Sequence, residues 1–216
     1  MPNQNQRIKP ILQLGPVIPV MVVERTEDAV PLAQALLAGG VKVLEITLRT
    51  PNALAVISAI ARHVPDAVVA AGTVTTPEQW EDAARAGARF AVSPGLTARL
   101  LDAAGKATIP LLPGVATASE LMTAMDAGFE CLKFFPAQQA GGAAMLKAWA
   151  GPLPQALFCP TGGITAASAP DYLALPNVAC VGGSWLTPAN EVQAGNWAAI
   201  TALAQAASAL PAAKPH

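Results

Sequence analysis

Residues 42–71 read KVLEITLRTPNALAVISAIARHVPDAVVAA, and this stretch indicates the fold most directly. A short run rich in β-branched residues, Lys42–Leu48, predicts a strand. A longer apolar-periodic segment, Asn52–His63, predicts a helix, and a second β-branched run, Ala67–Ala71, predicts the next strand. A strand, a helix and a strand over about 30 residues form the βαβ unit of a parallel sheet.

The same alternation continues in both directions along the chain. The other predicted strands are Val17–Val23, Phe90–Ser93, Ile109–Leu112, Cys131–Phe135, Leu157–Thr161 and Val178–Gly182. The other predicted helices are Glu27–Leu37, Pro77–Ala86, Ala98–Ala104, Ala118–Ala127, Gly142–Ala150, Ala166–Leu175 and Ala189–Ala207. Eight strands, each followed by a helix, predict an α/β protein with the (β/α)8 TIM barrel fold. A doubly wound open sheet remains the alternative, because periodicity alone does not show that a sheet closes.

The chain, residues 1–216, is expected to form a single (β/α)8 barrel domain, because no linker or low-complexity block interrupts it. Residues 1–14 are interpreted as an extra N-terminal helix that closes the floor of the barrel. Residues 211–216, rich in Ala and Pro, are expected to be a loose tail.

Glycine follows alanine where three of the predicted helices give way to strands. Because glycine adopts the left-handed backbone conformation that other residues resist, it is common just past a helix end. The three joints are Ala38-Gly39, Ala86-Gly87 and Ala127-Gly128.

The composition narrows the class of protein and its partners. Only 12% of the residues are charged and the formal net charge is −1, so neither nucleic acid nor an anionic membrane is expected as a partner. No segment has the length and apolarity of a signal peptide or a membrane span. Cys131, Cys159 and Cys180 form no CxxC pair and suit a reducing compartment. A cytoplasmic protein is expected, and the sparse charge indicates that partner subunits cover some of its surface.

The predicted strand after Val41 carries polar residues on one face. Glu45, Thr47 and Arg49 alternate with apolar residues, so they point to the face opposite the helices, which is the interior of a barrel. An edge strand with a solvated face is the alternative, although edges disappear when a sheet closes. We interpret Glu45 and Arg49 as functional residues.

Lys133 lies in the middle of the apolar strand CLKFFP, residues 131–136. Burial there removes water from the side chain and favours the neutral amine, which is the form that attacks a ketone. The alternatives are a lysine that pairs with an acid and fills space, or one that extends outward to solvent. The remaining lysines are expected at a strand start or in helices, loops and the tail: Lys9, Lys42, Lys106, Lys147 and Lys214. Lys133 is therefore the candidate nucleophile.

Two glycine-rich turns follow late strands, Thr161-Gly162-Gly163 and Gly182-Gly183-Ser184. TIM barrels commonly bind phosphate at this position, where backbone N–H groups are exposed and no Cβ stands in the way. A plain turn is the alternative for either one alone, and two turns at the two expected strand ends favour a phosphate site.

Other chemistries have little support in the sequence. The histidines are His63, in a predicted helix, and His216, and neither has a second ligand at metal spacing, so no metal is expected. The chain has no Walker motif, and no Gly-x-Gly-x-x-Gly leads from the first strand into a helix. No cofactor is therefore expected.

Six short motifs, in order along nearly the whole chain, resemble those of the 2-keto-3-deoxy-6-phosphogluconate (KDPG) aldolase family. They are LEITLRT (44–50), AGT (71–73), SPG (93–95), LKFFPA (132–137), CPTGGI (159–164) and GGSWL (182–186). The greatest likeness is to the bacterial bifunctional form, which is also a 4-hydroxy-2-oxoglutarate aldolase. Gln138, just after LKFFPA, departs from the Glu usual in the family and affects the expected details of that loop.

The resemblance implies a role for each matching position. Lys133 forms an imine with C2 of the keto acid, and Glu45 transfers protons. Substrate-binding positions at the strand ends are Arg49, Thr73, Pro94, Gly95, Phe135 and Thr161. Among them Arg49 and Thr73 hold the carboxylate, and Gly95 lets the chain pass close by. Phosphate-binding positions are Gly162, Gly163, Gly182, Gly183 and Ser184.

The resemblance also implies a reaction and an assembly. The expected enzyme is a class I aldolase, a carbon–carbon lyase of the Entner–Doudoroff pathway of carbohydrate metabolism, which works as a homotrimer. It would cleave KDPG to pyruvate and glyceraldehyde 3-phosphate, and also 4-hydroxy-2-oxoglutarate to pyruvate and glyoxylate. The alternatives are a 2-dehydro-3-deoxy-6-phosphogalactonate aldolase, or a phosphosugar isomerase or epimerase on the same fold. A non-catalytic sugar-phosphate binding barrel would be expected to lack Lys133 or Glu45.

Overall fold

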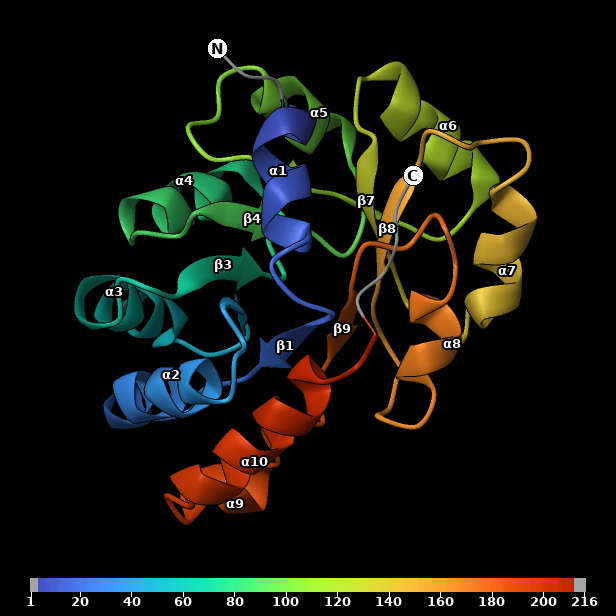
Figure 1. Ribbon diagram of the computed structural model, residues 1–216. Coiled ribbons are helices and arrows are strands. Elements are labelled where there is room, and N and C mark those ends of the chain that lie inside the picture. The colour runs from blue at the N-terminus through green and yellow to red at the C-terminus, as the bar shows by residue number, and fades with distance from the viewer. Residues whose placement is uncertain (1–3, 212–216) are drawn as a thin grey trace.

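The computed structural model describes residues 4–211, and its strands run parallel wherever they pair. The strands occupy the middle of the molecule and most helices lie around the outside (Figure 1). The strands are β1 Val17–Met21, β2 Val43–Thr47, β3 Val68–Gly72, β4 Phe90–Val92, β5 Leu111–Leu112, β6 Gly114–Val115, β7 Cys131–Phe134, β8 Leu157–Pro160 and β9 Val181–Gly183. The predicted α/β architecture with a parallel sheet is confirmed.

The helices fall between the strands as the alternation predicts. They are α1 Gln4–Leu12, α2 Ala29–Ala38, α3 Ala53–His63, α4 Pro77–Arg85, α5 Ala98–Ala104, α6 Ala118–Asp126, α7 Gly142–Trp149, α8 Ala169–Leu173, α9 Ala189–Gln193 and α10 Trp197–Ser208. The predicted helix Glu27–Leu37 starts with a separate 3-10 turn, Thr26–Asp28. The predicted helix Ala189–Ala207 is divided into α9 and α10, because Gly195 adopts a left-handed φ of 64° between them.

The paired strands form two sheets that adjoin at both ends. One sheet has the order β5-β4-β3-β2-β1-β9 and the other β6-β7-β8. The bridges Phe158↔Val178 and Thr161↔Gly182 join the region of β8 to that of β9. At the other side, Pro113 alone separates β5 from β6. The predicted fifth strand, Ile109–Leu112, therefore continues to Val115, with an interruption where proline has no N–H to donate.

Two hydrophobic clusters lie on the two faces of the strands. The larger one packs strand residues such as Leu44, Ile46 and Phe134 against the helices. The smaller one contains two residues of α1, alternate residues of several strands and two residues just before β9. Its members are Ile8, Leu12, Ile18, Val43, Ala70, Phe90, Val92, Leu112, Cys131, Leu157, Cys159, Ala179 and Cys180. We call this second group the inner cluster. In β2 the expected alternation holds, because Val43 belongs to the inner cluster while Leu44 and Ile46 face the helices.

Side-chain caps explain where several helices begin. The Thr117 hydroxyl accepts from the Glu120 N–H, and the Glu120 carboxylate accepts from the Thr117 N–H, which is a capping box at the start of α6. Hydrogen bonds from the Ala116 and Thr117 N–H groups lower the pKa of the Glu120 carboxyl. At the start of α4 the Thr76 hydroxyl accepts from the Gln79 N–H, and Pro77 occupies the first turn, where no N–H is needed.

The glycine joints need one correction. Gly87 and Gly128 adopt left-handed φ angles of 102° and 89°, as expected. Gly39 does not: its φ is −83°, and Gly40, with φ 91°, makes the left-handed turn instead. A Cβ on Gly39 would lie 2.4 Å from the Cβ of Ala204, so Gly39 lets α10 pack closely on the end of α2.

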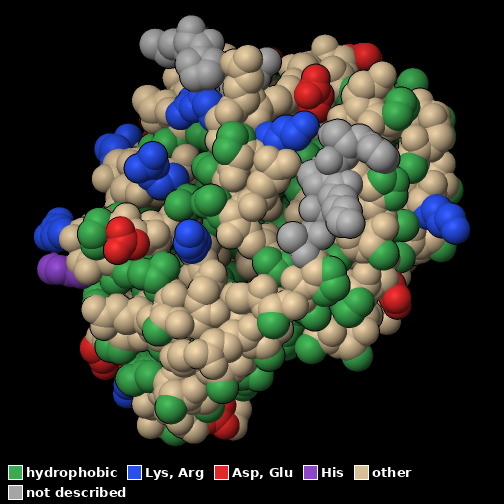
Figure 2. Space-filling view, in the orientation of Figure 1, with side chains coloured by type: hydrophobic (Ala, Val, Ile, Leu, Met, Phe, Trp, Pro, Cys, Tyr) green, Lys and Arg blue, Asp and Glu red, His purple; other side chains and the backbone are tan. Residues whose placement is uncertain are grey.

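The two ends of the chain correspond in part to the expectations. The predicted helix in residues 1–14 is α1, Gln4–Leu12, and Met1–Asn3 lie outside the described residues. The predicted loose tail also lies outside them, apart from Pro211. Within residues 4–211, every helix is too short or too polar to cross a bilayer. On the face of the molecule that carries α1, basic and acidic side chains are scattered rather than gathered by sign (Figure 2).

Candidate active site

Lys133 is held toward the inner side of the strands by its neighbours in β7. Leu132 and Phe134 pack on the helix side, where the ring of Phe134 meets Trp149 edge-on with centroids 5.3 Å apart. Because successive side chains alternate, Lys133 faces the opposite side with Cys131. The side chain of Lys133 is only 5% exposed. A lysine amine is thus buried in an apolar strand, as the sequence predicts.

Glu45 of β2 is the partner of that amine. Lys133 Nζ donates a hydrogen bond of 3.2 Å to Glu45 Oε1, and the Glu45 side chain is also 5% exposed. Lys133 Nζ lies 5.3 Å from the centroid of the Phe135 ring. In such a dry setting charge–charge interactions are stronger than in water, so the carboxylate fixes the position of the amine. The alternative of a lysine that extends to solvent is wrong.

Arg49 and Thr73 meet beyond the ends of β2 and β3. The Arg49 Nε donates to Thr73 Oγ1 at 3.2 Å. Arg49 was expected inside the strand, but β2 ends at Thr47 and Arg49 is exposed in the following turn. Thr73 has a φ of 60°, a left-handed conformation that is rare for a β-branched residue. Strained backbone of this kind often occurs at functional sites.

A pocket of about 200 Å³ opens at the carboxyl ends of the strands. It is lined by residues that follow or end five of them: Val20, Val22, Arg49, Lys133, Phe135, Thr161, Gly162, Gly163, Ile164, Gly182, Gly183 and Ser184. The tertiary structure therefore brings the candidate nucleophile, the arginine and both glycine-rich turns to one cavity. Glu45 does not line this pocket and is connected to it through its hydrogen bond with Lys133. Larger hollows lie elsewhere, one of them between α4 and α5, but Lys133 does not line them.

Only the first of the two predicted glycine turns is a turn: Gly182 and Gly183 belong to strand β9, where they pair with Ile18 and Pro19 of β1. Gly162 and Gly163 have φ angles of 103° and 73°, which favour glycine strongly. Gly182 does not have a left-handed φ. A Cβ there would lie 2.2 Å from Thr161 Oγ1, so glycine leaves room for the threonine side chain. Ser184 follows β9 and is exposed at the rim of the pocket.

The remaining predicted positions lie near the pocket without lining it. Thr73 is joined to it through Arg49, whereas Pro94 and Gly95, both within the described residues, are not part of its wall. A Cβ on Gly95 itself would meet no atom within 4 Å. The chain nevertheless passes close by here, because a Cβ on Gly114 would lie 2.3 Å from the carbonyl carbon of Pro94 and 2.7 Å from the Gly95 nitrogen, so Gly114 is the glycine that permits the approach.

Several residues of the site were missed from the sequence. Val20, Val22 and Ile164 line the pocket, and only the i, i+2 spacing of the two valines toward the end of a predicted strand could have indicated them. Val22 is 47% exposed, which is high for a large apolar side chain.

Gln138, the departure from the family pattern, lies against the predicted phosphate-binding turn at Gly162 and Gly163. Its N–H donates to the Gly162 carbonyl at 3.1 Å, and a Cβ on Gly163 would lie 2.4 Å from Gln138 Oε1. The loop after β7 is therefore packed directly on the turn after β8. An uncharged amide at this point adds no negative charge next to the candidate phosphate site.

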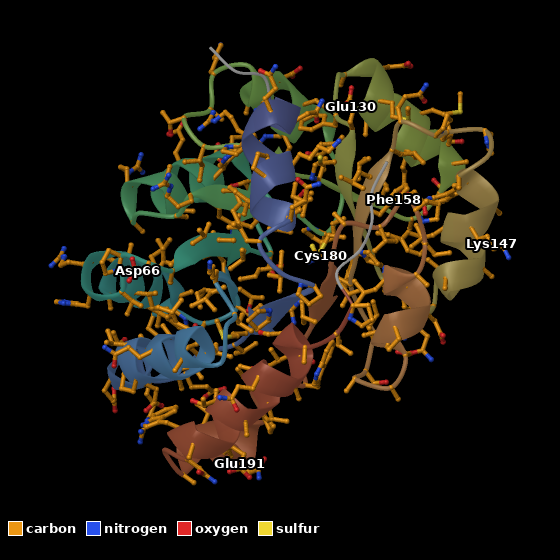
Figure 3. All side chains as sticks on the ribbon, viewed as in Figure 1. Asp66, Glu130, Lys147, Phe158, Cys180 and Glu191 are labelled. Carbon is orange, nitrogen blue, oxygen red and sulfur yellow. The ribbon has the colours of Figure 1, made fainter. Side chains whose placement is uncertain are left out.

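The three cysteines lie in the inner cluster and are free thiols. Cys180 is placed in the middle of the strands, while Phe158 lies between β8 and α7, and Lys147 points outward from α7 (Figure 3). Burial raises the pKa of the Cys131 thiol to about 12. A hydrogen bond with Cys159 and burial raise the pKa of Cys180 as well. Such thiols are poor nucleophiles at neutral pH, which leaves Lys133 as the candidate.

A buried amine paired with a carboxylate, beside an open pocket at the ends of parallel strands, is typical of enzymes that act on carbonyl compounds through a lysine. Comparison with known proteins narrows this class. The chain belongs to the KDPG and KHG aldolase family, whose model matches residues 8–203.

Individual relatives are similar to this chain along nearly its whole length. The KHG/KDPG aldolase of Escherichia coli (strain K12) is 55% identical over 207 residues, which cover 96% of this chain and 97% of the relative. The KDPG aldolase of Legionella pneumophila, with pyruvate captured as a covalent carbinolamine intermediate, has a TM-score of 0.91 at 52% identity and covers 93% of this chain and 98% of its own. The 2-keto-3-deoxy-6-phosphogluconate aldolase of Zymomonas mobilis ZM4 with 3-phosphoglycerate has a TM-score of 0.91 at 50% identity, covering 97% and 98%.

Proposed function

We propose that this protein is a class I aldolase that cleaves KDPG to pyruvate and glyceraldehyde 3-phosphate through an imine on Lys133. The buried contact between Lys133 Nζ and Glu45 Oε1, 3.2 Å long, carries the proposal. A lysine held against a carboxylate, and lining a pocket about 200 Å³ in volume, suits covalent attack on a small keto acid. The covalent carbinolamine with pyruvate in the Legionella pneumophila relative supports the same chemistry.

The first half of the reaction joins the amine to the substrate. The neutral Lys133 amine attacks C2 of the keto acid to form a carbinolamine, and loss of water gives a protonated imine. Glu45 is close enough to move the protons that these steps require, since its Oε1 already accepts from Lys133 Nζ.

In the second half the C3–C4 bond breaks. The C4 hydroxyl loses its proton and becomes the aldehyde of glyceraldehyde 3-phosphate, while the bonding electrons pass through C3 into the imine and form an enamine. Protonation at C3 regenerates an imine of pyruvate, and water releases pyruvate and the free amine. Glu45 is proposed to accept the C4 hydroxyl proton, directly or through water.

Binding roles follow from where the other side chains lie. Arg49 and Thr73 are proposed to hold the carboxylate next to Lys133, since a guanidinium can grip a carboxylate with two hydrogen bonds. Phe135 lines the pocket and is proposed as a wall of the pyruvyl site, and Thr161 as a substrate contact. Pro94 and Gly95 do not line the pocket and are proposed to complete that site from behind Gly114, which pairs with Lys133. The phosphate is assigned to the backbone N–H groups of the glycine pairs and to the exposed Ser184, which all line the pocket: Gly162, Gly163, Gly182, Gly183 and Ser184.

We also propose that the two sheets form one closed (β/α)8 barrel in a single domain, with α1 as an extra helix across its floor. The bridges between β8 and β9, and the single proline between β5 and β6, support closure. The inner cluster supports it too, because strand residues from both sheets contact one another there together with Ile8 and Leu12 of α1.

The proposal extends to a cytoplasmic homotrimer in the Entner–Doudoroff pathway. The low content of charged residues, 12%, supports a surface partly covered by other subunits, and three reduced thiols suit the cytoplasm. Light scattering distinguishes a monomer of 22.0 kDa from a trimer of about three times that mass.

Borohydride trapping tests the function directly. Pyruvate and borohydride should add a reduced pyruvyl group to Lys133, located by peptide mass mapping, and the exposed Lys147 serves as the internal control. An unmodified protein that nevertheless turns over a phosphosugar would favour the isomerase or epimerase alternative. The two C4 epimers of the substrate separate the gluconate enzyme from the galactonate enzyme. Cleavage of 4-hydroxy-2-oxoglutarate tests the second activity, which the name of the Escherichia coli relative supports.

A further inference from the structure

Gly72, the last residue of β3, lies directly beside the carboxylate of Glu45. A Cβ on Gly72 would lie 2.3 Å from Glu45 Oε1, 2.7 Å from its Cγ and 2.9 Å from its Cδ. Atoms cannot approach so closely, so the Glu45 side chain occupies the space that any side chain at position 72 would need. Gly72 does not have a left-handed φ, so backbone conformation is not the reason for glycine here.

The strand pairing explains how the two residues meet. Glu45 pairs in register with Ala70, and Gly72 pairs with Thr47, two residues farther along. The Glu45 side chain therefore leans along β3 toward the carboxyl ends of the strands rather than standing over its own partner. This inclination carries the carboxylate up to the level where Lys133 Nζ meets it at 3.2 Å.

The backbone at Gly72 has little freedom to move aside. Its carbonyl accepts from the Leu48 N–H at 2.8 Å, which continues the pairing with β2. Two residues later, the Val74 N–H donates to the Val92 carbonyl at 3.0 Å. The chain is thus tied to β2 on one side and to β4 on the other. The three atoms nearest to a new Cβ, by contrast, all belong to the Glu45 side chain, and a side chain can rotate.

We propose that Gly72 is a positioning residue for the aldolase reaction, because its missing side chain fixes the conformation in which Glu45 reaches Lys133. A methyl group at position 72 should displace the carboxylate and leave the strands in place. The proposal rests on the proposed function, since it assumes that Glu45 transfers protons for a covalent lysine.

The structure offers two glycines as controls. Gly39 is as crowded as Gly72, with Ala204 Cβ at 2.4 Å and the Thr201 carbonyl oxygen at 2.7 Å from an added Cβ, but it lies where α2 meets α10, away from the pocket. Gly151 has no atom within 4 Å of an added Cβ. Gly39→Ala thus measures how steric crowding away from the pocket affects stability and kcat. Gly151→Ala measures the effect of replacing a glycine where there is no crowding.

The first experiment measures cleavage of KDPG by the full-length variants. Gly72→Ala should lower kcat about 100-fold, the scale of general acid–base catalysis, while KM changes little because Arg49 and the glycine turns remain. Gly39→Ala should lower the melting temperature without a selective loss of kcat, and Gly151→Ala should change neither. A Gly72→Ala enzyme with wild-type kcat would overturn the proposal, as would an equal loss of kcat in Gly39→Ala.

The second experiment repeats the substitution where Glu45 is absent. In a Glu45→Ala background the three atoms nearest to position 72 are removed, so adding Gly72→Ala should lower neither the residual kcat nor the melting temperature. In the wild-type background it should lower kcat, and any loss of stability should appear only there. An equal effect in both backgrounds would overturn the proposal, because Gly72 would then act independently of Glu45. This comparison of melting temperatures decides the question even if the single variant folds poorly.

The proposed function is tested separately by the wild-type protein. If pyruvate and borohydride fail to modify Lys133 in the wild type, the covalent mechanism is wrong whatever Gly72 does. If the wild type is modified but the two backgrounds respond alike to Gly72→Ala, the aldolase function stands and the role of Gly72 is refuted.

Discussion

The amine of Lys133 donates to the Glu45 carboxylate at 3.2 Å, although the two residues are 88 positions apart. Their strands, β7 and β2, belong to different sheets and are not hydrogen-bonded neighbours. The contact therefore crosses the space between strands rather than following the sheet. Both side chains are only 5% exposed. Because little water can solvate them, the charge of each group is balanced mainly by the other group.

Replacement of the lysine should affect both activity and folding. Lys133→Met should abolish pyruvate trapping and cleavage, and it should lower the free energy of unfolding by about 3 kcal/mol, because Glu45 is left buried without a partner. Chemical denaturation measures the second effect. Adding Glu45→Gln to Lys133→Met should recover much of the lost stability and none of the activity. Equal stability of the single and double variants would show that the pair is not electrostatically coupled.

Replacement of the carboxylate separates chemistry from structure. Glu45→Gln keeps the shape of the side chain, so the fold should survive, while kcat should fall by about 10² to 10⁴ because the amide cannot accept a proton. Steady-state kinetics on KDPG provides the measurement. Glu78→Gln, at an exposed site on α4, is the matched control and should leave kcat unchanged. Wild-type kcat in Glu45→Gln would remove this residue from the mechanism.

Thr73 combines a strained backbone with a useful hydroxyl. Thr73→Gly should relieve the left-handed φ of 60°, so stability should stay within about 1 kcal/mol of wild type or rise. The KM for the keto acid should nevertheless increase, because Arg49 loses its acceptor. Thr73→Val removes the hydroxyl but keeps the strain, and should raise KM without any gain in stability. If KM is unchanged in both variants, the hydroxyl has no part in binding.

Ser184 provides a test of the phosphate site. Ser184→Ala should raise KM about tenfold for KDPG, in line with the loss of one hydrogen bond to a charged group. The KM for 4-hydroxy-2-oxoglutarate, which has no phosphate, should change much less. Kinetics with the two substrates side by side makes the comparison internal to each variant. Equal increases for both substrates would contradict a phosphate role.

Alkaline pH should destabilise the protein through Cys131. Burial raises the pKa of this thiol from 9.0 to about 12, so above pH 9 the unfolded chain loses a proton that the folded protein keeps. Stability is then fully present below pH 9 and falls between pH 9 and about 12, by about 1.4 kcal/mol per pH unit for one thiol. Urea denaturation across this range measures the slope. Cys131→Ala should reduce the slope by about 1.4 kcal/mol per pH unit and leave the part due to Cys180, whose pKa is also raised; an unchanged slope would contradict a contribution from Cys131.

Much of the site could be predicted from residue type and spacing. Lys133 stands out because a charged residue interrupts the apolar strand that begins at Cys131, and Glu45 because it alternates with Leu44 and Ile46. These are local signals, and the structure buries both residues on the face that the alternation predicts. The turn at Gly162 and Gly163 was likewise visible as a glycine pair after a strand, whereas Gly182 and Gly183 are part of strand β9. The sequence did not show how deeply these residues are buried, which residues they contact or that they share a pocket. These properties depend on which strands lie next to one another in the fold.

The need for glycine at other positions could not be predicted, because it is set by a segment that is distant in the sequence. Gly39 was expected to make a turn, but it makes room for α10, whose Ala204 is far along the chain. The chain passes close to Gly95 as expected, but the glycine that makes room is Gly114, which faces the backbone of Pro94 and Gly95. Gly72 reads as an ordinary strand end until the Glu45 side chain is seen beside it. Steric limits on glycine are thus set by its neighbours in space.

The sequence by itself determined the alternation of strands and helices, the buried face of each strand and the residue types available for chemistry. These follow from side-chain periodicity and hydrophobicity, which act over a few neighbouring residues. Only the tertiary structure decided that Lys133 meets Glu45, that Arg49 turns onto Thr73, and that Gly72 leaves room for a carboxylate. Such contacts depend on the register and packing of strands distant in the chain, and local pattern does not specify them.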